Sequence, residues 1–246
     1  MKRQSLGQHY LSDQAVVERM VAEAALEGTE RAVEIGTGKG ALTPLLARRC
    51  GRLDAYEVDP ENYRATLAAG LGANAFVHLV DAFGERPEFD VLVSSLPYSR
   101  SQDFVEWISQ RRYRRGVVLL QEDFVRKLLA PPGSRDYRGV SAISQVSMEV
   151  REVCRVGRSS FSPPPRVSSL LVAIRPTRTL TAAEVGRVKR LFSLRRREVR
   201  SALASAGMVG AGPYGRRRVY SLTPDEVYGL CRDGAGALST GGPGGA

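Results

Sequence analysis

The amino-acid sequence predicts an α/β fold, in which helices cover both faces of a mostly parallel β-sheet and a small helical unit follows. Short hydrophobic runs alternate with helical patterns from residue 31 onward, and this alternation is typical of repeated βα units. The chain has 246 residues, of which 43% are hydrophobic, so it can bury the core of one sizeable domain and a small appendage.

Hydrophobic runs predict seven strands, which lie at residues 31–36, 53–59, 75–80, 89–95, 116–122, 151–156 and 167–176. Helical patterns occur between them, at residues 40–50, 60–70, 102–111, 123–130 and 139–150. We expect Pro176 to close the domain that contains this sheet.

The residues after Pro176 predict a second unit. Residues 179–207 have the pattern of one or two helices that end at Gly207, and a last helix begins with Thr223 as N-cap and Pro224 in its first turn. We therefore expect three parts, which are a sheet domain at residues 1–176, a basic helical domain at 177–237 and a disordered Gly-rich tail at 238–246.

Positive charge gathers in the C-terminal part of the chain. Of a net charge of +10, residues 1–176 contribute little, with 24 Lys and Arg against 21 Asp and Glu, whereas residues 177–246 hold 12 against 5. Such a surface suits a polyanion, because each phosphate that it neutralises releases counterions. A solvated, Arg-rich surface that favours solubility or heat stability is the alternative.

Membrane and metal-binding classes are not supported. No stretch approaches the ~18 to 20 apolar residues of a membrane span, and the first ten residues lack the apolar core of a signal peptide, so we expect a cytoplasmic protein. Cys50, Cys154 and Cys231 form no CxxC motif, and the histidines are His9 and His78. Neither a structural zinc nor a disulfide framework is expected from these spacings.

A glycine loop follows the first predicted strand, with the sequence Glu34-Ile35-Gly36-Thr37-Gly38-Lys39-Gly40. Glycines between a strand and a helix let a ligand approach the backbone closely, although a loop of this kind alone is as often a tight turn. A dinucleotide site would have GxGxxG, and Glu34 would lie badly beside a pyrophosphate. A carboxylate there suits a ligand with a cationic amino-acid end, such as S-adenosylmethionine.

Two further acids follow the next strands. Glu57 lies near the end of the second strand, where the ribose hydroxyls of a nucleoside would be held, and Asp81 follows the third strand, within reach of an adenine amino group. Ligands of open α/β sheets bind at the carboxyl ends of strands, so three acids at successive ends strengthen the prediction of a nucleoside cofactor. The chain contains no GxxxxGK[ST] phosphate loop.

Six short motifs occur in a fixed order: GQHYL at 7–11, EIGTGKGALT at 34–43, SLPY at 95–98, QE at 121–122, YRGVS at 137–141 and FSPPPRVSS at 161–169. Together they resemble the small-subunit rRNA adenine N6,N6-dimethyltransferases, relatives of the macrolide-resistance rRNA methyltransferases. The likeness covers about residues 2–232, and LFSLRRREVRSAL at 191–203 resembles the helical C-terminal segment of that family.

The resemblance implies a class I S-adenosylmethionine-dependent methyltransferase, with a Rossmann-like, mostly parallel seven-stranded sheet and a small α-helical C-terminal domain. It implies methyl transfer to N6 of two adjacent adenosines in the 3′-terminal hairpin loop of small-subunit rRNA, during ribosome biogenesis. The implied partner is that rRNA within an assembling small ribosomal subunit, and the protein is expected to act as a monomer without a membrane.

The resemblance also implies roles for individual residues. The implied cofactor residues are Gln8, His9, Leu11, Glu34, Gly36, Gly38, Glu57, Asp81, Ala82 and Ser95. The implied catalytic residues are Ser95, Leu96, Pro97, Tyr98 and Phe161. Phosphate contacts are expected from Arg195, Arg196, Arg197, Arg216, Arg217 and Arg218, for which solvated helix faces are the alternative.

The stretch Ser95-Leu96-Pro97-Tyr98 suits amine methylation, because adenine N6 is a poor nucleophile whose lone pair is delocalised into the ring. The Ser95 hydroxyl and the Leu96 carbonyl could accept the N6 hydrogens, while Tyr98 and Phe161 could stack on the base. The common motif has Asn where this chain has Ser95, and serine offers a shorter acceptor. A weakened, RNA-binding assembly factor and an N-methyltransferase for another nucleic acid are therefore alternatives.

Overall fold

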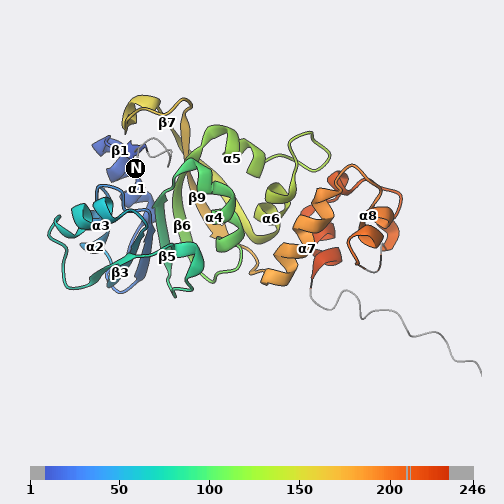
Figure 1. Ribbon diagram of the computed structural model, residues 1–246, viewed down its shortest axis with the longest axis horizontal. Helices are drawn as coiled ribbons and strands as arrows, with labels where there is room; N and C mark the ends of the chain where they lie inside the picture. The colour runs from blue at the N-terminus through green and yellow to red at the C-terminus, as the bar shows by residue number, and fades with distance from the viewer. Residues whose placement is uncertain (1–8, 209, 211, 233–246) are drawn as a thin grey trace, which may run out of the picture.

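The computed structural model describes residues 9–208, 210 and 212–232. Its main strands are β2 (Arg31–Ile35), β3 (Arg52–Glu57), β4 (Ala75–Leu79), β5 (Val91–Ser95), β6 (Arg115–Gln121), β7 (Met148–Val156) and β9 (Ser169–Pro176). They form one sheet in the order β4-β3-β2-β5-β6-β9-β7 (Figure 1). The first five strands in this order are parallel, whereas β9 is antiparallel to both β6 and β7. The predicted mostly parallel, seven-stranded sheet is confirmed.

Helices cover both faces of this sheet, and they are α1 (Gln14–Ala24), α2 (Thr43–Ala47), α3 (Pro60–Leu67), α4 (Ser101–Ile108), α5 (Glu122–Leu128) and α6 (Gly139–Ser147). Successive residues of the central strands belong to different hydrophobic clusters, because side chains alternate between the faces of a strand. Leu92 packs with residues of α4, α5 and α6, whereas Val91 and Val93 pack with residues of α1 and α2.

Some observed helices differ from the predicted ones. Helix α1 is not among the predictions, although Asp13 caps it and its buried residues Val17, Met20, Val21 and Ala24 recur at helical spacing. The helix predicted at 139–150 ends at Ser147, because Met148 is extended and begins the pairing of β7 with β9. Helix α2 is shorter than the predicted 40–50, since Gly40 has a φ of 78°.

A second sheet joins distant parts of the chain. It pairs β1 (Tyr10–Leu11) with β8 (Phe161–Ser162) in antiparallel register, with Leu11 opposite Phe161. Nearby, His9 Nδ1 lies 2.8 Å from the carbonyl oxygen of Pro163, and the Ser160 hydroxyl donates to the carboxylate of Asp13. The N-terminal motif and the FSPPPRVSS motif are therefore neighbours at the carboxyl edge of the main sheet.

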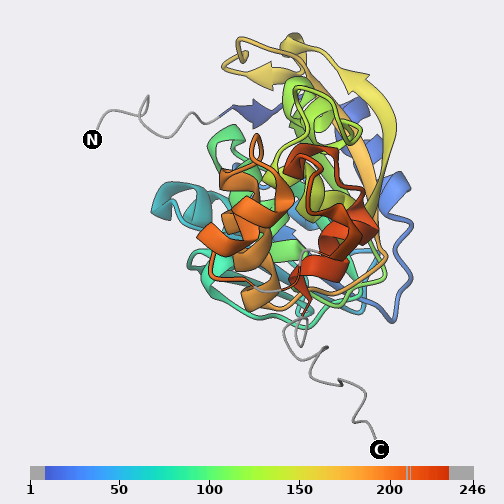
Figure 2. The same ribbon diagram turned by 90° about the vertical axis from the view of Figure 1, so that its right-hand side faces the viewer.

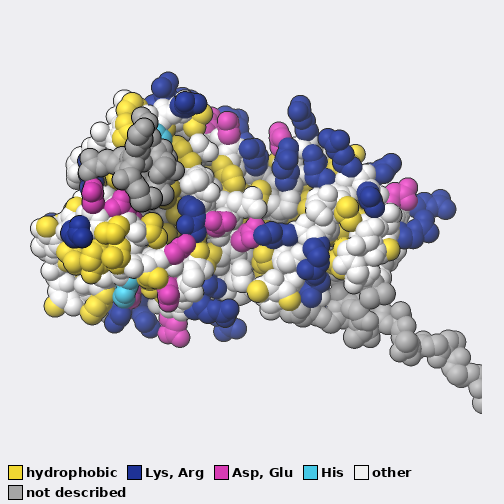
Figure 3. All heavy atoms as spheres, in the orientation of Figure 1, with side chains coloured by type: hydrophobic (Ala, Val, Ile, Leu, Met, Phe, Trp, Pro, Cys, Tyr) yellow, Lys and Arg dark blue, Asp and Glu magenta, His cyan; other side chains and the backbone are white. Residues whose placement is uncertain are grey.

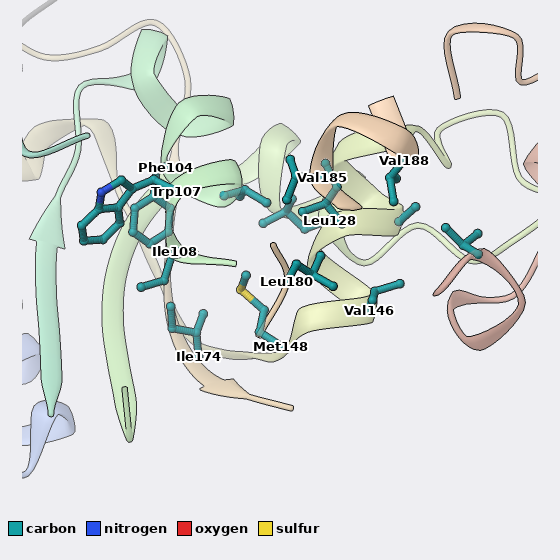
Figure 4. Packing of buried hydrophobic residues seen from close by; sticks show 14 of the residues in the cluster. Phe104, Trp107, Ile108, Leu128, Val146, Met148, Ile174, Leu180, Val185 and Val188 are labelled. Carbon is teal, nitrogen blue, oxygen red and sulfur yellow. The ribbon is translucent and has the colours of Figure 1, made fainter. Parts of the chain in front are cut away.

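The C-terminal helices are α7 (Ala182–Ser193), α8 (Val199–Ser205) and α9 (Pro224–Cys231). They pack together beyond α6, at one end of the molecule (Figure 1 and Figure 2). The predicted stop at Gly207 and the cap are confirmed: α8 ends just before Gly207, and Thr223 accepts a hydrogen bond from the backbone of Glu226. One hydrophobic cluster runs from Ile174 on the sheet to Val188 on α7 (Figure 4). The division into domains at Pro176 stays a prediction, and the tail at 238–246 lies outside the described residues.

The described residues provide neither a membrane-spanning helix nor a metal-binding cluster. No helix among them is both long and apolar enough to cross a membrane. The same residues contain no group of three or more His, Cys, Asp or Glu side chains that could hold a metal ion. The three cysteines are free thiols.

Candidate functional site

The glycine loop lies between the end of β2 and α2, with backbone angles that favour glycine. Gly36 has a φ of 77° and Gly38 a φ of 55°, a region that residues with side chains rarely adopt. A Cβ atom on Gly38 would lie 3.2 Å from the ring of Tyr10, so the loop and β1 approach closely. The space beside the loop is therefore bounded by the N-terminal motif.

Glu34 lies beneath this loop and is fully buried, and neither carboxylate oxygen makes a hydrogen bond within the described residues. Burial raises the pKa of Glu34 to about 8, the nearby Thr43 hydroxyl partly opposes this increase, and the charge of Glu57 adds to it. Thr43 is close enough to favour the ionised form but lacks the geometry of a hydrogen bond. An unpaired buried carboxyl group costs free energy unless a ligand pairs with it.

Glu57, at the end of β3, is fixed by backbone groups. One carboxylate oxygen accepts hydrogen bonds from the N–H groups of Val58 and Asp59, at 2.8 and 2.9 Å. The other accepts from the N–H of Gly38 at 2.9 Å. The side chain therefore links the end of β3 to the glycine loop and keeps an acceptor oxygen beside the loop.

Asp81 follows β4 and is held by Arg100, which the sequence analysis did not single out. Arg100 Nη2 lies 3.0 Å from Asp81 Oδ2, and Arg100 Nε lies 2.8 Å from Asp103 Oδ2. The other oxygen of Asp81 accepts from the backbone N–H of Phe83, and the guanidinium group lies over the Phe83 ring. The SLPYSR stretch contains Arg100, but nothing in the sequence indicates its partners.

Two adjoining cavities bring the predicted cofactor residues together. The Asp81 cavity, of about 150 Å³, extends from the glycine loop to Asp81, and the glycine-loop cavity, of about 50 Å³, contains Glu34 in its lining. The predicted cofactor residues that line at least one of these two cavities are His9, Leu11, Glu34, Gly36, Gly38, Glu57, Asp81, Ala82 and Ser95. Gln8 lies outside the described residues.

Exposed apolar side chains also line the Asp81 cavity. Val58 and Val80 are 52% and 39% exposed, and they follow the ends of β3 and β4. Neither residue is among those predicted from the sequence, although an apolar residue beside an acid at a strand end was a usable signal. Together with Phe83, they give this cavity apolar walls that suit a flat ring.

The two serines at the end of β5 have different surroundings. Ser94 is fully buried, and its hydroxyl donates a hydrogen bond of 2.6 Å to the carbonyl oxygen of Ile35. Ser95 is partly exposed and its hydroxyl has no hydrogen-bond partner among the described residues. It lines both the Asp81 cavity and the glycine-loop cavity. The hydroxyl of Ser95 is thus available to a ligand.

The five predicted catalytic residues surround a third cavity. This Tyr98 cavity measures about 10 Å³ and is lined by His9, Ser95, Leu96, Pro97, Tyr98, Leu119 and Phe161. It holds roughly one water molecule, so a purine does not fit there without movement of the walls. An outer groove of about 1030 Å³ adjoins it and is lined by Tyr98, Gln121 and Arg166 among others. Tyr98 lines both spaces, and its hydroxyl is 2.7 Å from that of Ser169.

Residues 1–215 match the family described as ribosomal RNA adenine dimethylase. The chain belongs to the ribosomal RNA adenine dimethylase family. The predicted family and enzyme class are thereby confirmed, and the protein is an S-adenosylmethionine-dependent rRNA adenine dimethyltransferase. S-adenosylmethionine is its cofactor, as the acids at the strand ends predicted.

Named relatives agree with membership of the dimethylase family. The chain is 33% identical over 238 residues to a probable ribosomal RNA small subunit methyltransferase A of Thermococcus gammatolerans, covering 91% of this chain and 86% of the relative. It is 32% identical over 231 residues to the ribosomal RNA small subunit methyltransferase A of Thermotoga petrophila, covering 92% of this chain and 88% of the relative. A dimethyladenosine transferase structure from Plasmodium falciparum has a TM-score of 0.75 at 23% identity, and the match covers 90% of this chain and 96% of that structure's chain. This likeness confirms the class I methyltransferase fold.

The described residues of this dimethylase fit the cofactor. The unpaired carboxyl group of Glu34 would suit an ammonium group as its counterion, and Glu57 presents an acceptor oxygen fixed by the backbone. Apolar walls and the Asp81 carboxylate lie further along the same cavity. The chemistry of these groups matches, in order, the amino-acid, ribose and adenine parts of S-adenosylmethionine.

The predicted arginine clusters of the dimethylase lie away from these cavities, at the end formed by α7, α8 and α9 (Figure 1). Arg195, Arg196 and Arg197 occupy the turn between α7 and α8. Arg217 pairs with Glu226, and Arg218 donates to the carbonyl oxygen of Arg196. The second cluster therefore also holds the C-terminal helices together.

We expect Glu34 to make the cofactor-free protein less stable as the pH rises. The folded-state pKa of about 8 exceeds the ordinary value of 4.5, so the folded state holds a proton that the unfolded state has lost between these values. The contribution of Glu34 to the free energy of unfolding is most favourable below pH 4.5. It decreases by on the order of 4 kcal/mol as the pH rises to 8. Glu34→Gln removes this loss, so its stability relative to wild type should increase from pH 5 to pH 8 in urea unfolding. A difference that is constant over this range would contradict the assignment.

Proposed function

We propose that this chain transfers methyl groups to N6 of two adjacent adenosines in the 3′-terminal hairpin loop of small-subunit rRNA. It acts as a monomer on an assembling small subunit in the cytoplasm, as part of ribosome biogenesis. The names of the relatives from Thermococcus and Thermotoga support the small subunit as the target. The observation that carries the proposal is the unpaired hydroxyl of Ser95, which lies where the cofactor cavities and the Tyr98 cavity meet.

On this proposal, three carboxylates position the cofactor. Glu34 pairs with the ammonium group, Glu57 accepts from the ribose hydroxyls, and Asp81 accepts from the adenine amino group. Bound S-adenosylmethionine supplies an electrophilic methyl group. β1 and the glycine loop enclose the adjoining cavity, so these two segments would exclude water from the methyl group.

The target adenosine enters through the outer groove, which has room for a base that has left its stack. Tyr98 stacks on it, with the ring direction fixed by the hydroxyl of Ser169, which is buried at the start of β9. The Ser95 hydroxyl and the Leu96 carbonyl accept the N6 hydrogens and orient the nitrogen lone pair. Phe161 is 4% exposed in the closed Tyr98 cavity, so this wall must move before it contacts a base.

Basic side chains would hold the rest of the RNA. We assign phosphate contacts to Arg195, Arg196, Arg197 and Arg216, which make no ion pair with a carboxylate among the described residues. Arg217 and Arg218 are already engaged within the protein and contribute positive potential. Contacts of this kind orient an RNA without reading its sequence.

The first test is the activity of Ser95 variants. Wild-type protein and labelled S-adenosylmethionine are incubated with unmethylated small subunits, and modified adenosines are mapped by primer extension and nucleoside mass spectrometry. Ser95→Ala should reduce kcat by roughly 10²-fold, with little change in cofactor affinity, because a positioned acceptor is lost. Ser95→Asn, which restores a side-chain acceptor, should retain activity.

If the Ser95→Ala variant had the same kcat as the wild type, this result would contradict the role of the Ser95 hydroxyl as an acceptor. Cofactor binding by the wild type without any methyl transfer would favour the alternative of an RNA-binding assembly factor.

The second test concerns Asp81 and adenine. Arg100→Leu should lower the affinity for S-adenosylhomocysteine by about tenfold, because a charge-assisted hydrogen bond no longer holds Asp81. The affinity for S-inosylhomocysteine, which lacks the amino group, should change much less. Calorimetry of both ligands measures the difference, and Asp103→Asn is the control that breaks only the other ion pair of Arg100. An equal loss for both ligands would show that Arg100 supports the fold rather than recognition of the base.

A further inference from the structure

His9 lies where the cavities of the site adjoin. Among the described residues, it alone lines the Asp81 cavity, the glycine-loop cavity, the Tyr98 cavity and the outer groove. The first two of these spaces suit the cofactor, and the last two are the proposed path of the target base. A side chain in this position can contact both reaction partners, so its chemistry bears on methyl transfer.

The small sheet of β1 and β8 fixes the imidazole ring of His9. His9 directly precedes β1 and Pro163 directly follows β8, and the two strands pair through Tyr10 and Ser162. His9 Nδ1 lies 2.8 Å from the carbonyl oxygen of Pro163. The ring also lies beside that of Tyr98, with centroids 5.7 Å apart. A purine stacked on Tyr98 would therefore have the imidazole ring as a neighbour.

The contact with Pro163 decides which ring nitrogen of His9 can accept a proton. A carbonyl oxygen only accepts hydrogen bonds, so Nδ1 must carry a hydrogen. In the neutral ring, the free lone pair is then on Nε2. Nε2 has no hydrogen-bond or ion-pair partner within the described residues. The side chain therefore offers a basic nitrogen that the protein orients and that a ligand can reach.

Methyl transfer to N6 produces a proton that needs an acceptor. The N6 lone pair forms a bond with the methyl carbon, the bond between this carbon and sulfur breaks, and its electron pair stays on sulfur. N6 thereby becomes cationic, and it returns to neutrality by losing one hydrogen as a proton. The Ser95 hydroxyl and the Leu96 carbonyl can orient the N6 hydrogens, but neither oxygen is basic enough to keep a proton. Among the described residues that line the Tyr98 cavity, only His9 has a neutral basic nitrogen.

We infer that His9 is a further catalytic residue, whose Nε2 atom accepts the proton that N6 loses as the methyl group is transferred. The inference rests on the proposed function for the place of the target base. The imidazole ring becomes cationic as N6 becomes neutral, so positive charge does not stay on the base. Nε2 then gives the proton to water in the outer groove, which His9 also lines. The neutral ring is thereby ready for the second methyl transfer.

Other titratable groups face the same spaces. Burial raises the pKa of the Tyr98 phenol above its ordinary value of 10, although the hydrogen bond with Ser169 opposes this increase. Besides the phenols of Tyr10 and Tyr56, the charged side chains of the two cofactor cavities are Glu34, Lys39, Glu57, Asp81 and Arg100, and the outer groove adds Asp59, Glu61 and Arg166. Because burial raises the pKa of Glu34 to about 8, an effect of pH on activity has to be assigned with variants.

The first test determines the tautomer of His9 by NMR of protein with 15N-labelled histidine at mildly alkaline pH. His9 should give the signals of the Nδ1–H tautomer, both alone and with S-adenosylhomocysteine bound. The His78→Asn variant assigns these signals, because His78 is the other histidine, lies on β4 beside Asp54 and lines none of the four spaces. Signals of the Nε2–H tautomer would overturn the inference, since Nε2 would then have no lone pair for a proton.

The second test measures single-turnover methyl transfer to unmethylated small subunits with saturating S-adenosylmethionine. His9→Asn keeps an N–H group for the Pro163 carbonyl but has no basic nitrogen, so its rate should decrease by roughly 10²-fold. The wild-type rate should decrease as the pH falls through the range in which histidine gains a proton. This dependence on pH should disappear in His9→Asn and persist in the matched control His78→Asn.

Binding of the RNA should depend little on His9. Lys and Arg side chains gather in a row over α5, α6 and the C-terminal helices, along the upper edge of the molecule (Figure 3). Because this charge is available to the RNA in every His9 variant, KM for small subunits should change little in His9→Asn while kcat decreases.

Three results would overturn the inference. They are a wild-type rate in His9→Asn, a reduced rate with an unchanged dependence on pH, and a lower affinity for S-adenosylhomocysteine with a wild-type rate at saturation. The last result would leave His9 as a cofactor residue only. The mapped positions of the methyl groups test the proposed function separately. Transfer to other adenosines that still depends on His9 would contradict the proposed target and support the inference, whereas no transfer by the wild type would overturn both.

Discussion

A buried hydrogen bond between β5 and β2 positions the candidate active site. The hydroxyl of Ser94 donates to the carbonyl oxygen of Ile35, the last residue before the glycine loop, at 2.6 Å. Residues of a strand alternate in direction, so fixing Ser94 toward β2 turns Ser95 toward the cavities. Ser95, the proposed acceptor for the target base, and the glycine loop are thereby neighbours, as methyl transfer between two bound groups requires.

The small sheet of β1 and β8 completes the enclosure of this site. It places Tyr10 against Gly38 and brings Phe161 to the same side as Tyr98. The cavity between Tyr98 and Phe161 is nevertheless closed to a base. On the proposed function, a base can enter between these two rings only if the walls of the cavity move, whereas the cofactor residues already line a connected space.

Charge divides the molecule into two regions. Carboxylates at the ends of β2, β3 and β4 face the cavities for a cationic cofactor, and Glu34 is unpaired without it. Arginines gather at the other end, around a hollow that has no acidic lining. A folded RNA is large enough to reach from one region to the other, so anchoring and chemistry can be carried out by different parts of the fold.

The sequence by itself determined the sheet, the glycine loop and the three acids, because strand periodicity and glycine backbone angles are local properties. It also identified the family from six motifs, and with it the enzyme class and cofactor. Local patterns did not decide the end of α6, where pairing of Met148 with β9 replaced a continued helix. Tertiary structure alone decided that Arg100 holds Asp81, that Ser94 rather than Ser95 is buried, and that His9 meets the carbonyl group of Pro163. Each of these depends on contacts between segments distant in sequence, and such contacts leave no periodic signal in the chain.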